Sequence, residues 1–212
     1  ILAEKVGLQD PSVVYARDLG PGFSFYIIYA KCAQTVDVSQ IVVNKPEFTV
    51  MKKDDVDAYI KANFNRKITV IGACIETDAH TVGIDAIMNM KGYNGHKGLE
   101  SYKGINAVNL GAQVSSEELT AKALSCGAEA ILVSQVVTQK NVHLANLTRL
   151  VDILEAEGIR EKVVLVVGGP RITHELAKEL GYDAGFGKNT YPEEVASFIV
   201  QELVKRQAGK NE

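Results

Sequence analysis

Asp78 and His80, which are separated by one position, have the residue types and spacing needed to hold a metal ion. A neutral imidazole is a good metal ligand, and its second ring nitrogen is usually held by a carboxylate or a carbonyl group. An aspartate two residues away in a loop can supply that partner. The alternative is a loop aspartate beside a surface histidine, and for an isolated pair this second interpretation is the commoner one.

Small residues recur at the points where a bound group would need room. Gly83 follows His80 by three positions and permits close approach of its backbone. Ser134 and the dipeptide Gly168–Gly169 each come at the end of an apolar run. The sequence therefore predicts a slot that runs from the His80 loop into the domain.

The elements that must position these residues begin after Arg66. Five apolar runs predict buried strands, since strands covered on both faces have nearly continuous apolar sequences. They are Lys67–Ala73, Ala107–Leu110, Ala130–Val133, Val163–Val167 and the weaker Asp183–Phe186. The stretches between them carry apolar residues three or four apart, which predicts helices. Strands alternating with helices imply right-handed crossovers and a parallel sheet, so we expect a flavodoxin-like (Rossmann-like) α/β domain over residues 66–212.

The first 65 residues have a different character. Ser24–Ala30 and Gln40–Asn44 are rich in β-branched and aromatic residues and predict strands, while Asp54–Ile60 predicts a short helix. We expect a small α+β lobe over residues 1–65, which serves dimerisation or contact with another subunit. The chain starts at Ile1 without an initiator Met, which is what a clipped N-terminus would give.

Composition argues against several classes of protein. The chain has 212 residues, of which 46% are hydrophobic and 23% charged, as in ordinary soluble globular proteins. Its net charge of −3 gives no reason to expect nucleic-acid binding, and no apolar run approaches the length of a membrane span. Three cysteines do not make a disulfide framework and favour a reducing cytoplasm. The first strand–helix turn lacks G-x-G-x-x-G and the chain lacks a Walker A loop, which argues against a dinucleotide or nucleoside triphosphate site.

The order Asp-x-His-x-x-Gly, Ser-x-hydrophobic and Gly-Gly resembles the cobalamin-binding signature of proteins in which a histidine replaces the dimethylbenzimidazole base beneath cobalt. The resemblance implies that His80 is the cobalt ligand and Asp78 its hydrogen-bonding partner. It places other residues at the corrin and along the slot for the displaced nucleotide tail. The residues flanking the corrin are Thr81, Val82 and Gly83, those lining the slot are Ser134, Val136, Gly168 and Gly169, and those at its outer end are Phe186 and Gly187.

This chain departs from that signature in two ways. Ser134-Gln135-Val136 stands where the family usually has Ser-x-Leu, and valine keeps the wall apolar. The spacing from Gly83 to Ser134 is also longer than in many relatives. The extra length lies in the glycine-rich segment from Met88 to Gly98, which predicts a pliable loop after the first helix, on the cofactor side.

The stretch DAHTVGIDAIMNMKGYNGHKG is similar to the β subunits of lysine 5,6-aminomutases, and the similarity runs through the whole chain. In that family the lysine eleven residues after the cobalt-ligating histidine forms a Schiff base with pyridoxal 5′-phosphate, which corresponds here to Lys91. Lys97 and Lys103 lie nearby, and only the family spacing selects Lys91. We expect His96 to be an exposed loop residue.

The resemblance implies an isomerase subunit that uses adenosylcobalamin and pyridoxal 5′-phosphate in a radical 1,2-shift of the terminal amine of D-lysine or L-β-lysine. A larger α subunit, a TIM barrel, would supply most substrate contacts in an α2β2 assembly. Two alternatives remain open. One is the cobalamin domain of a D-ornithine 4,5-aminomutase, and the other is a non-catalytic corrinoid carrier, in which Lys91 would have no role.

Overall fold

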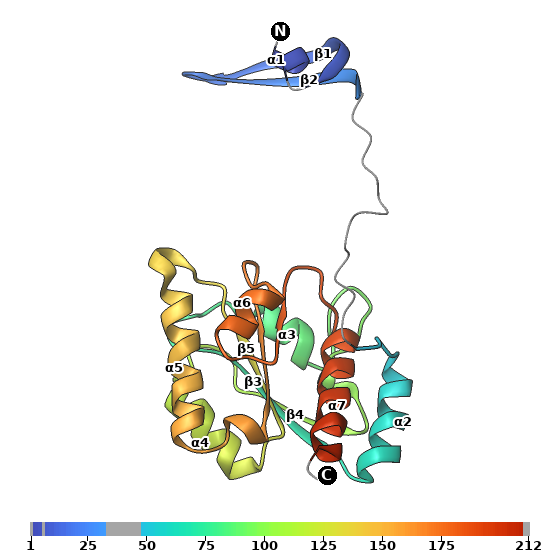
Figure 1. Ribbon diagram of the computed structural model, residues 1–212, viewed down its shortest axis with the longest axis vertical. Helices are drawn as coiled ribbons and strands as arrows, with labels where there is room; N and C mark the ends of the chain where they lie inside the picture. The colour runs from blue at the N-terminus through green and yellow to red at the C-terminus, as the bar shows by residue number, and fades with distance from the viewer. Residues whose placement is uncertain (1, 6, 33–47, 210–212) are drawn as a thin grey trace. The chain divides into compact units, whose positions relative to one another are not determined.

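The computed structural model describes residues 2–5, 7–32 and 48–209, and the chain divides into two compact units, residues 1–46 and 47–212 (Figure 1). The division lies earlier than the predicted one at residue 65. The reason is helix α2 (Lys53–Phe64), whose buried Val56 and Ile60 join the core of the second unit and which packs on α7 (Pro192–Ala208). The predicted strand at Gln40–Asn44 lies outside the described residues.

The first unit contains a short helix, α1 (Leu2–Lys5), and an antiparallel hairpin of β1 (Leu8–Gly20) and β2 (Phe23–Cys32). The prediction of a strand at Ser24–Ala30 is confirmed, whereas β1 was not foreseen, because it contains Pro11. The register shifts between Gln9 and Ser12, so Pro11 falls at an irregularity where its missing N–H costs no ladder hydrogen bond.

The second unit is a five-stranded parallel sheet in the order β4-β3-β5-β6-β7, which confirms the flavodoxin-like prediction. Its strands are β3 (Ile68–Cys74), β4 (Ile105–Asn109), β5 (Ala130–Ser134), β6 (Val164–Gly168) and β7 (Ala184–Phe186). Besides α2 and α7, its helices are α3 (Val82–Met88), α4 (Ser116–Cys126), α5 (Val142–Ala156) and α6 (His174–Glu179). Three single turns of 3-10 helix are η2 (Leu99–Ser101), η3 (Gln139–Asn141) and η4 (Arg160–Lys162).

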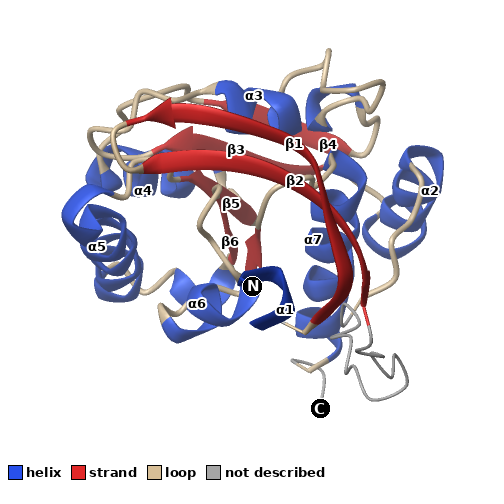
Figure 2. Ribbon diagram, turned by 90° about the horizontal axis from the view of Figure 1, so that it is seen from above, coloured by secondary structure: helices blue, strands red, loops and turns tan. Residues whose placement is uncertain are grey.

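Two apolar layers hold this sheet between its helices. Alternate strand residues face opposite sides: Val70 and Leu132 belong to the layer under α2, α3 and α7, and Ile71 and Ile131 to the layer under α4, α5 and α6. Figure 2 shows α4 and α5 on one side of the sheet and α2 and α7 on the other. Because both faces are covered, the strands read as continuous apolar runs, which is why the sequence identifies them so clearly.

Local sequence signals also set where two of the helices begin. The Ser115 hydroxyl accepts a hydrogen bond from the backbone N–H of Glu118 (3.1 Å) at the start of α4. Helix α7 begins at Pro192, and the Glu194 carboxylate accepts from the Tyr191 N–H (2.8 Å). Within the described residues, no helix combines the length and the apolar character that crossing a bilayer requires.

Candidate functional site

Small side chains stand side by side at the carboxyl edge of the sheet. The strand register pairs Cys74 with Ser134, Ser134 with Gly168, and Gly168 with Phe186. With so little side-chain volume at three neighbouring strand ends, a cavity of about 260 Å³ remains open there. It lies where the doubly wound topology predicts a ligand site.

The cavity brings together seven of the residues that the sequence assigns to the corrin and to the slot for the nucleotide tail. They are Gly83, Ser134, Val136, Gly168, Gly169, Phe186 and Gly187. A Cβ atom on Gly169 would lie 2.3 Å from the Gln135 carbonyl oxygen, so no larger residue fits this turn without a shift of the backbone. Apolar side chains such as Ile84 and Val166 complete the walls, and Lys188 is the one charged residue among the described lining residues.

His80 is not among the described residues that line this cavity, although Gly83, three positions further on, is, and a carboxylate holds the His80 ring. The Asp78 side chain has no exposed surface, and its Oδ1 lies 2.8 Å from His80 Nδ1 and accepts the His80 backbone N–H at 3.0 Å. The His80 side chain remains 61% exposed. A carboxylate at Nδ1 selects the tautomer that leaves a lone pair on Nε2, which is the form that binds a metal.

The second oxygen of Asp78 ties the His80 loop to the segment after β5. Asp78 Oδ2 accepts from the backbone N–H groups of Val136 and Val137 (3.0 Å for Val137) and from the side-chain amide of Gln135 (3.2 Å). Burial raises the pKa of Asp78, but the hydrogen bonds from Val136, Val137 and His80 outweigh it, so the pKa lies below its usual range. Asp78 is therefore a buried carboxylate that stays charged and crosslinks two loops of the site.

Two further side chains that contact Asp78 or His80 are not predicted from the sequence. Gln135 is buried and donates to Asp78, and its position inside Ser-x-hydrophobic was the only available signal. Cys74 donates from Sγ to the His80 carbonyl oxygen (3.3 Å), and burial raises the pKa of its thiol to about 11. The thiol is therefore neutral at physiological pH, and it anchors the backbone of His80.

Thr81 and Val82 lie outside the cavity lining, at the start of α3. The Thr81 carbonyl accepts the Asp85 N–H (2.8 Å), and the Val82 side chain projects outward at 80% exposed. An exposed valine two residues from an exposed histidine gives an apolar surface next to His80.

Lys91 is exposed and lies in the segment that follows α3. Asn109, the last residue of β4, donates through its side-chain amide to Asp85 Oδ1 and to Asn89 Oδ1, both at 2.7 Å. These bonds hold α3 and the start of the Lys91 segment near the carboxyl end of β4. Lys91 itself is not among the residues that line the cavity.

His96 makes more contacts than the expected exposed loop residue. Its ring stacks on Tyr191 with centroids 3.9 Å apart, and its Nδ1 lies 3.0 Å from Glu193 Oε2. By contrast, His143 is buried in the first turn of α5, and His174 is exposed at the start of α6.

Comparison with protein families shows the class of protein to which this chain belongs. The B12 binding domain matches residues 68–196, which contain the parallel sheet, His80 and the cavity, so the second unit is a B12-binding domain. The dimerisation domain of D-ornithine 4,5-aminomutase matches residues 1–45.

Comparison with individual proteins narrows the class to one family. The chain is 53% identical to the lysine 5,6-aminomutase beta subunit of Fusobacterium nucleatum, over 99% of this chain and 80% of that protein. It is 52% identical to the corresponding subunit of Acetoanaerobium sticklandii, over 97% of this chain and 78% of that protein. The chain belongs to the family of lysine 5,6-aminomutase beta subunits.

The alternative ornithine enzyme is more distant. The D-ornithine 4,5-aminomutase subunit beta of A. sticklandii is 30% identical over 98% of this chain, which covers 27% of that protein. The higher identity and the fuller coverage both favour the lysine family over the ornithine enzyme.

Proposed function

We propose that this chain is the β subunit of a radical aminomutase, which works with an α subunit to shift the terminal amine of D-lysine or L-β-lysine to the neighbouring carbon. The observation that carries the proposal is the exposed His80, held at Nδ1 by the buried Asp78, whose other oxygen binds the backbone N–H of the cavity residue Val136. When bound, adenosylcobalamin supplies the radical chemistry and pyridoxal 5′-phosphate holds the migrating amine.

The residues present fit cobalamin. His80 Nε2 would supply a nitrogen ligand to cobalt, and the Asp78 carboxylate would fix the ring and raise its basicity as a ligand. The exposed Val82 and the neighbouring Thr81 offer the surface on which the corrin would lie. The cavity would take the nucleotide tail between walls of small and apolar residues, chiefly Ser134, Gly168 and Gly169.

Lys91 is the residue that we assign to pyridoxal 5′-phosphate. Only a primary amine condenses with the aldehyde of this cofactor, and the four-carbon stem of lysine gives it reach. The exposed position of Lys91, beyond the cavity, suits an amine that must meet a cofactor shared with another subunit. A corrinoid carrier would have no use for it.

The partner is an α subunit, which we propose to be a TIM barrel in an α2β2 assembly. The hairpin of the first unit carries many exposed aromatic and aliphatic side chains, among them Phe23 (73% exposed) and Tyr29 (70%). Such an apolar surface is typical of a subunit interface, and we assign it to the contact between the two copies of this chain in that assembly. The free thiols of Cys74 and Cys126 agree with a reducing cytoplasm as the working compartment.

The replacement His80→Ala tests the proposal directly. Since the His80 side chain is largely exposed, we expect the fold to persist and the cobalt ligand from the protein to be lost. Electron paramagnetic resonance of bound cob(II)alamin, with ¹⁵N-labelled histidine, should show nitrogen hyperfine splitting from the protein that disappears in the variant. His174→Ala, at another exposed histidine, is the control. Splitting that persists in His80→Ala would exclude this residue as the ligand.

A further inference from the structure

The segment that carries Lys91, residues 89–98, is held in a compact turn by its own backbone hydrogen bonds. The Gly92 N–H donates to the Asn89 carbonyl (2.9 Å), and Tyr93 and His96 exchange two backbone hydrogen bonds of 2.9 Å. At Gly92, where φ is +65°, a Cβ atom would lie 1.8 Å from the His96 carbonyl oxygen. A Cβ on Gly98 would lie 2.1 Å from the Asn89 oxygen. The glycines therefore permit close backbone contacts that fix one shape, where the sequence alone predicts a pliable loop.

Side-chain contacts hold this segment against the start of α7. The His96 and Tyr191 rings stack with an interplanar angle of 21°, and His96 Nδ1 lies 3.0 Å from Glu193 Oε2. Asn94 donates through its side-chain amide to the Tyr191 hydroxyl (3.4 Å). The His96 side chain is 39% exposed and that of Glu193 is 21% exposed, so solvent weakens this pairing only in part. We call His96, Tyr191 and Glu193 the clasp.

The clasp is fixed to the start of helix α7, next to the cobalamin slot. Tyr191 caps α7, and its N–H is held by Glu194. The two residues before it, Asn189 and Thr190, line the slot. The clasp therefore connects the Lys91 segment with the wall of the cobalamin cavity through adjacent residues of the chain.

We propose that His96 is a positioning residue for Lys91. Its stacking on Tyr191 and its contact with Glu193 hold the segment in one conformation, so that the Lys91 amine is presented at a fixed place relative to the cobalamin slot. A fixed backbone lowers the entropy that Lys91 must lose when it bonds covalently to a cofactor. The inference rests on the proposed role of Lys91 as the lysine that binds pyridoxal.

The test uses the assembled enzyme with His96→Ala, which removes both clasp contacts, and Glu193→Gln, which keeps the stacking. His174→Ala is the matched control, since it replaces an exposed histidine on another element. The first readout is amide hydrogen exchange at Tyr93 and His96. The second is the pyridoxal phosphate concentration that half-saturates borohydride-fixed pyridoxyl on the Lys91 peptide, measured by mass spectrometry.

In His96→Ala we expect faster amide exchange in the segment and a roughly tenfold higher half-saturating concentration, because a stacked ring pair and a charge-assisted hydrogen bond are both lost. Glu193→Gln should show a smaller shift in the same direction, and His174→Ala none. Cobalamin affinity should stay constant in all three variants, which shows that the domain remains folded.

Two outcomes overturn the inference. One is unchanged exchange in His96→Ala, since the clasp would then not hold the segment. The other is faster exchange with unchanged labelling of Lys91, since the segment would then be anchored without effect on the amine. If the unaltered enzyme carries no pyridoxyl group on Lys91, the proposed role of Lys91 fails, and the inference fails with it. The unaltered protein thus separates the two kinds of failure.

Discussion

Asp78 shows how one buried charge organises the candidate site. Its two oxygens receive hydrogen bonds from His80 on one side and from Gln135, Val136 and Val137 on the other. Hydrogen bonds to a charged group are about twice as strong as those between neutral groups, so this carboxylate both orients the ring and joins two loops.

The substitution Asp78→Asn should therefore affect cobalamin binding and stability together. We expect cobalamin affinity to fall by about 10- to 100-fold, as is usual when the partner of a metal-binding histidine is removed. The amide also turns a donor toward backbone N–H groups, which costs about 1–3 kcal/mol of unfolding free energy. Absorbance titration with cobalamin and thermal unfolding measure the two effects. Asp152→Asn, at an exposed position of α5, is the control.

The folding stability of Asp78→Asn should also depend on pH less strongly than that of the unaltered protein. The pKa of Asp78 is lower in the folded protein than its usual value, so its ionised form stabilises the fold above about pH 4. That contribution is lost as the pH falls through the folded-state pKa. Stability measured from pH 6 to pH 3 should fall more steeply in the unaltered protein than in Asp78→Asn, and parallel curves would contradict this role.

At the level of residues, a local sequence pattern indicates which small side chains meet at the strand ends. Ser134, Gly168 and Gly169 are recognisable because each is a small residue at the end of an apolar run, and the structure brings them together around one cavity. Gln135 and His96 were missed as structural partners because their contacts, Asp78 and Tyr191, are distant in sequence. Nothing in local spacing reveals such pairings.

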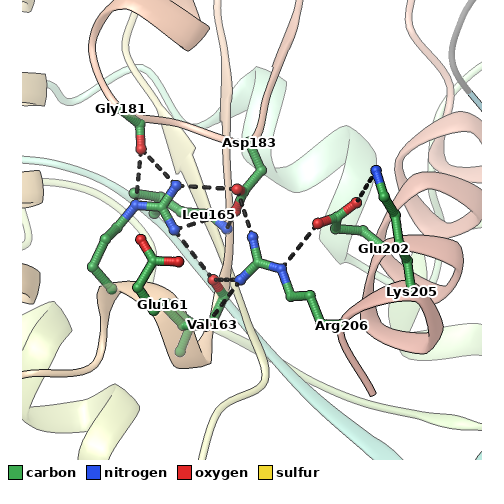
Figure 3. A network of polar contacts seen from close by, with 9 residues as sticks. Glu161, Val163, Leu165, Gly181, Asp183, Glu202, Lys205 and Arg206 are labelled. Atoms are coloured by element: carbon green, nitrogen blue, oxygen red, sulfur yellow. Dashed lines mark hydrogen bonds and ion pairs between the residues drawn. The ribbon is translucent and has the colours of Figure 1, made fainter. Parts of the chain in front are cut away.

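A charged network around Asp183, just before β7, joins α7 and β6 at the edge of the sheet opposite the candidate site. Figure 3 shows its carboxylate between Arg206 of α7 and the backbone of Leu165 in β6. Asp183 Oδ2 accepts the Leu165 N–H at 2.7 Å, and Oδ1 lies 2.6 Å from an Arg206 nitrogen and 3.1 Å from one of Arg160. These side chains are all less than one fifth exposed, at 13% for Asp183, 19% for Arg206 and 9% for Arg160.

Removing the central charge should destabilise the domain without changing the site. Asp183→Ala removes the carboxylate that pairs with Arg160, while Arg206 keeps its ion pair with Glu202 (3.0 Å), and breaking a buried pair costs about 3–5 kcal/mol. Thermal unfolding measures the drop. Glu117→Gln, which breaks the exposed Arg149–Glu117 pair, should leave the Tm almost unchanged. Cobalamin affinity should persist in Asp183→Ala at low temperature, and its loss would show that the network supports the cavity as well.

Prediction from sequence is uneven at the level of elements, for physical reasons. The five strands of the sheet were identified because burial on both faces imposes continuous apolar runs. Strand β1 was missed because Pro11 and the charged residues of a solvent-exposed ribbon conceal its pattern. Helix α2 was found, but its attachment to α7 depends on tertiary packing, so the predicted boundary at residue 65 fell too late.

At the scale of the whole molecule, the two units differ in how they bury apolar surface. The second unit has two apolar layers around its sheet. The hairpin of the first unit is a single two-stranded ribbon, and isolated ribbons of this kind are marginal in water. Phe23, Phe25, Ile27 and Tyr29 alternate along β2 and so share one face, and all four are exposed within the chain.

This face is where we expect copies of the subunit to associate, in line with the match of residues 1–45 to a dimerisation domain. The double substitution Phe25→Ser and Tyr29→Ser should reduce the mass of the assembled enzyme by about half, since an interface depends on a few buried aromatic anchors. Light scattering coupled to gel filtration measures that mass. Lys31→Ala, which breaks only the exposed ion pair with Asp10, is the control. Cobalamin binding should persist in both variants, because all the described lining residues of the slot belong to the second unit. An unchanged mass in the double variant would mean that copies of the subunit associate through another surface.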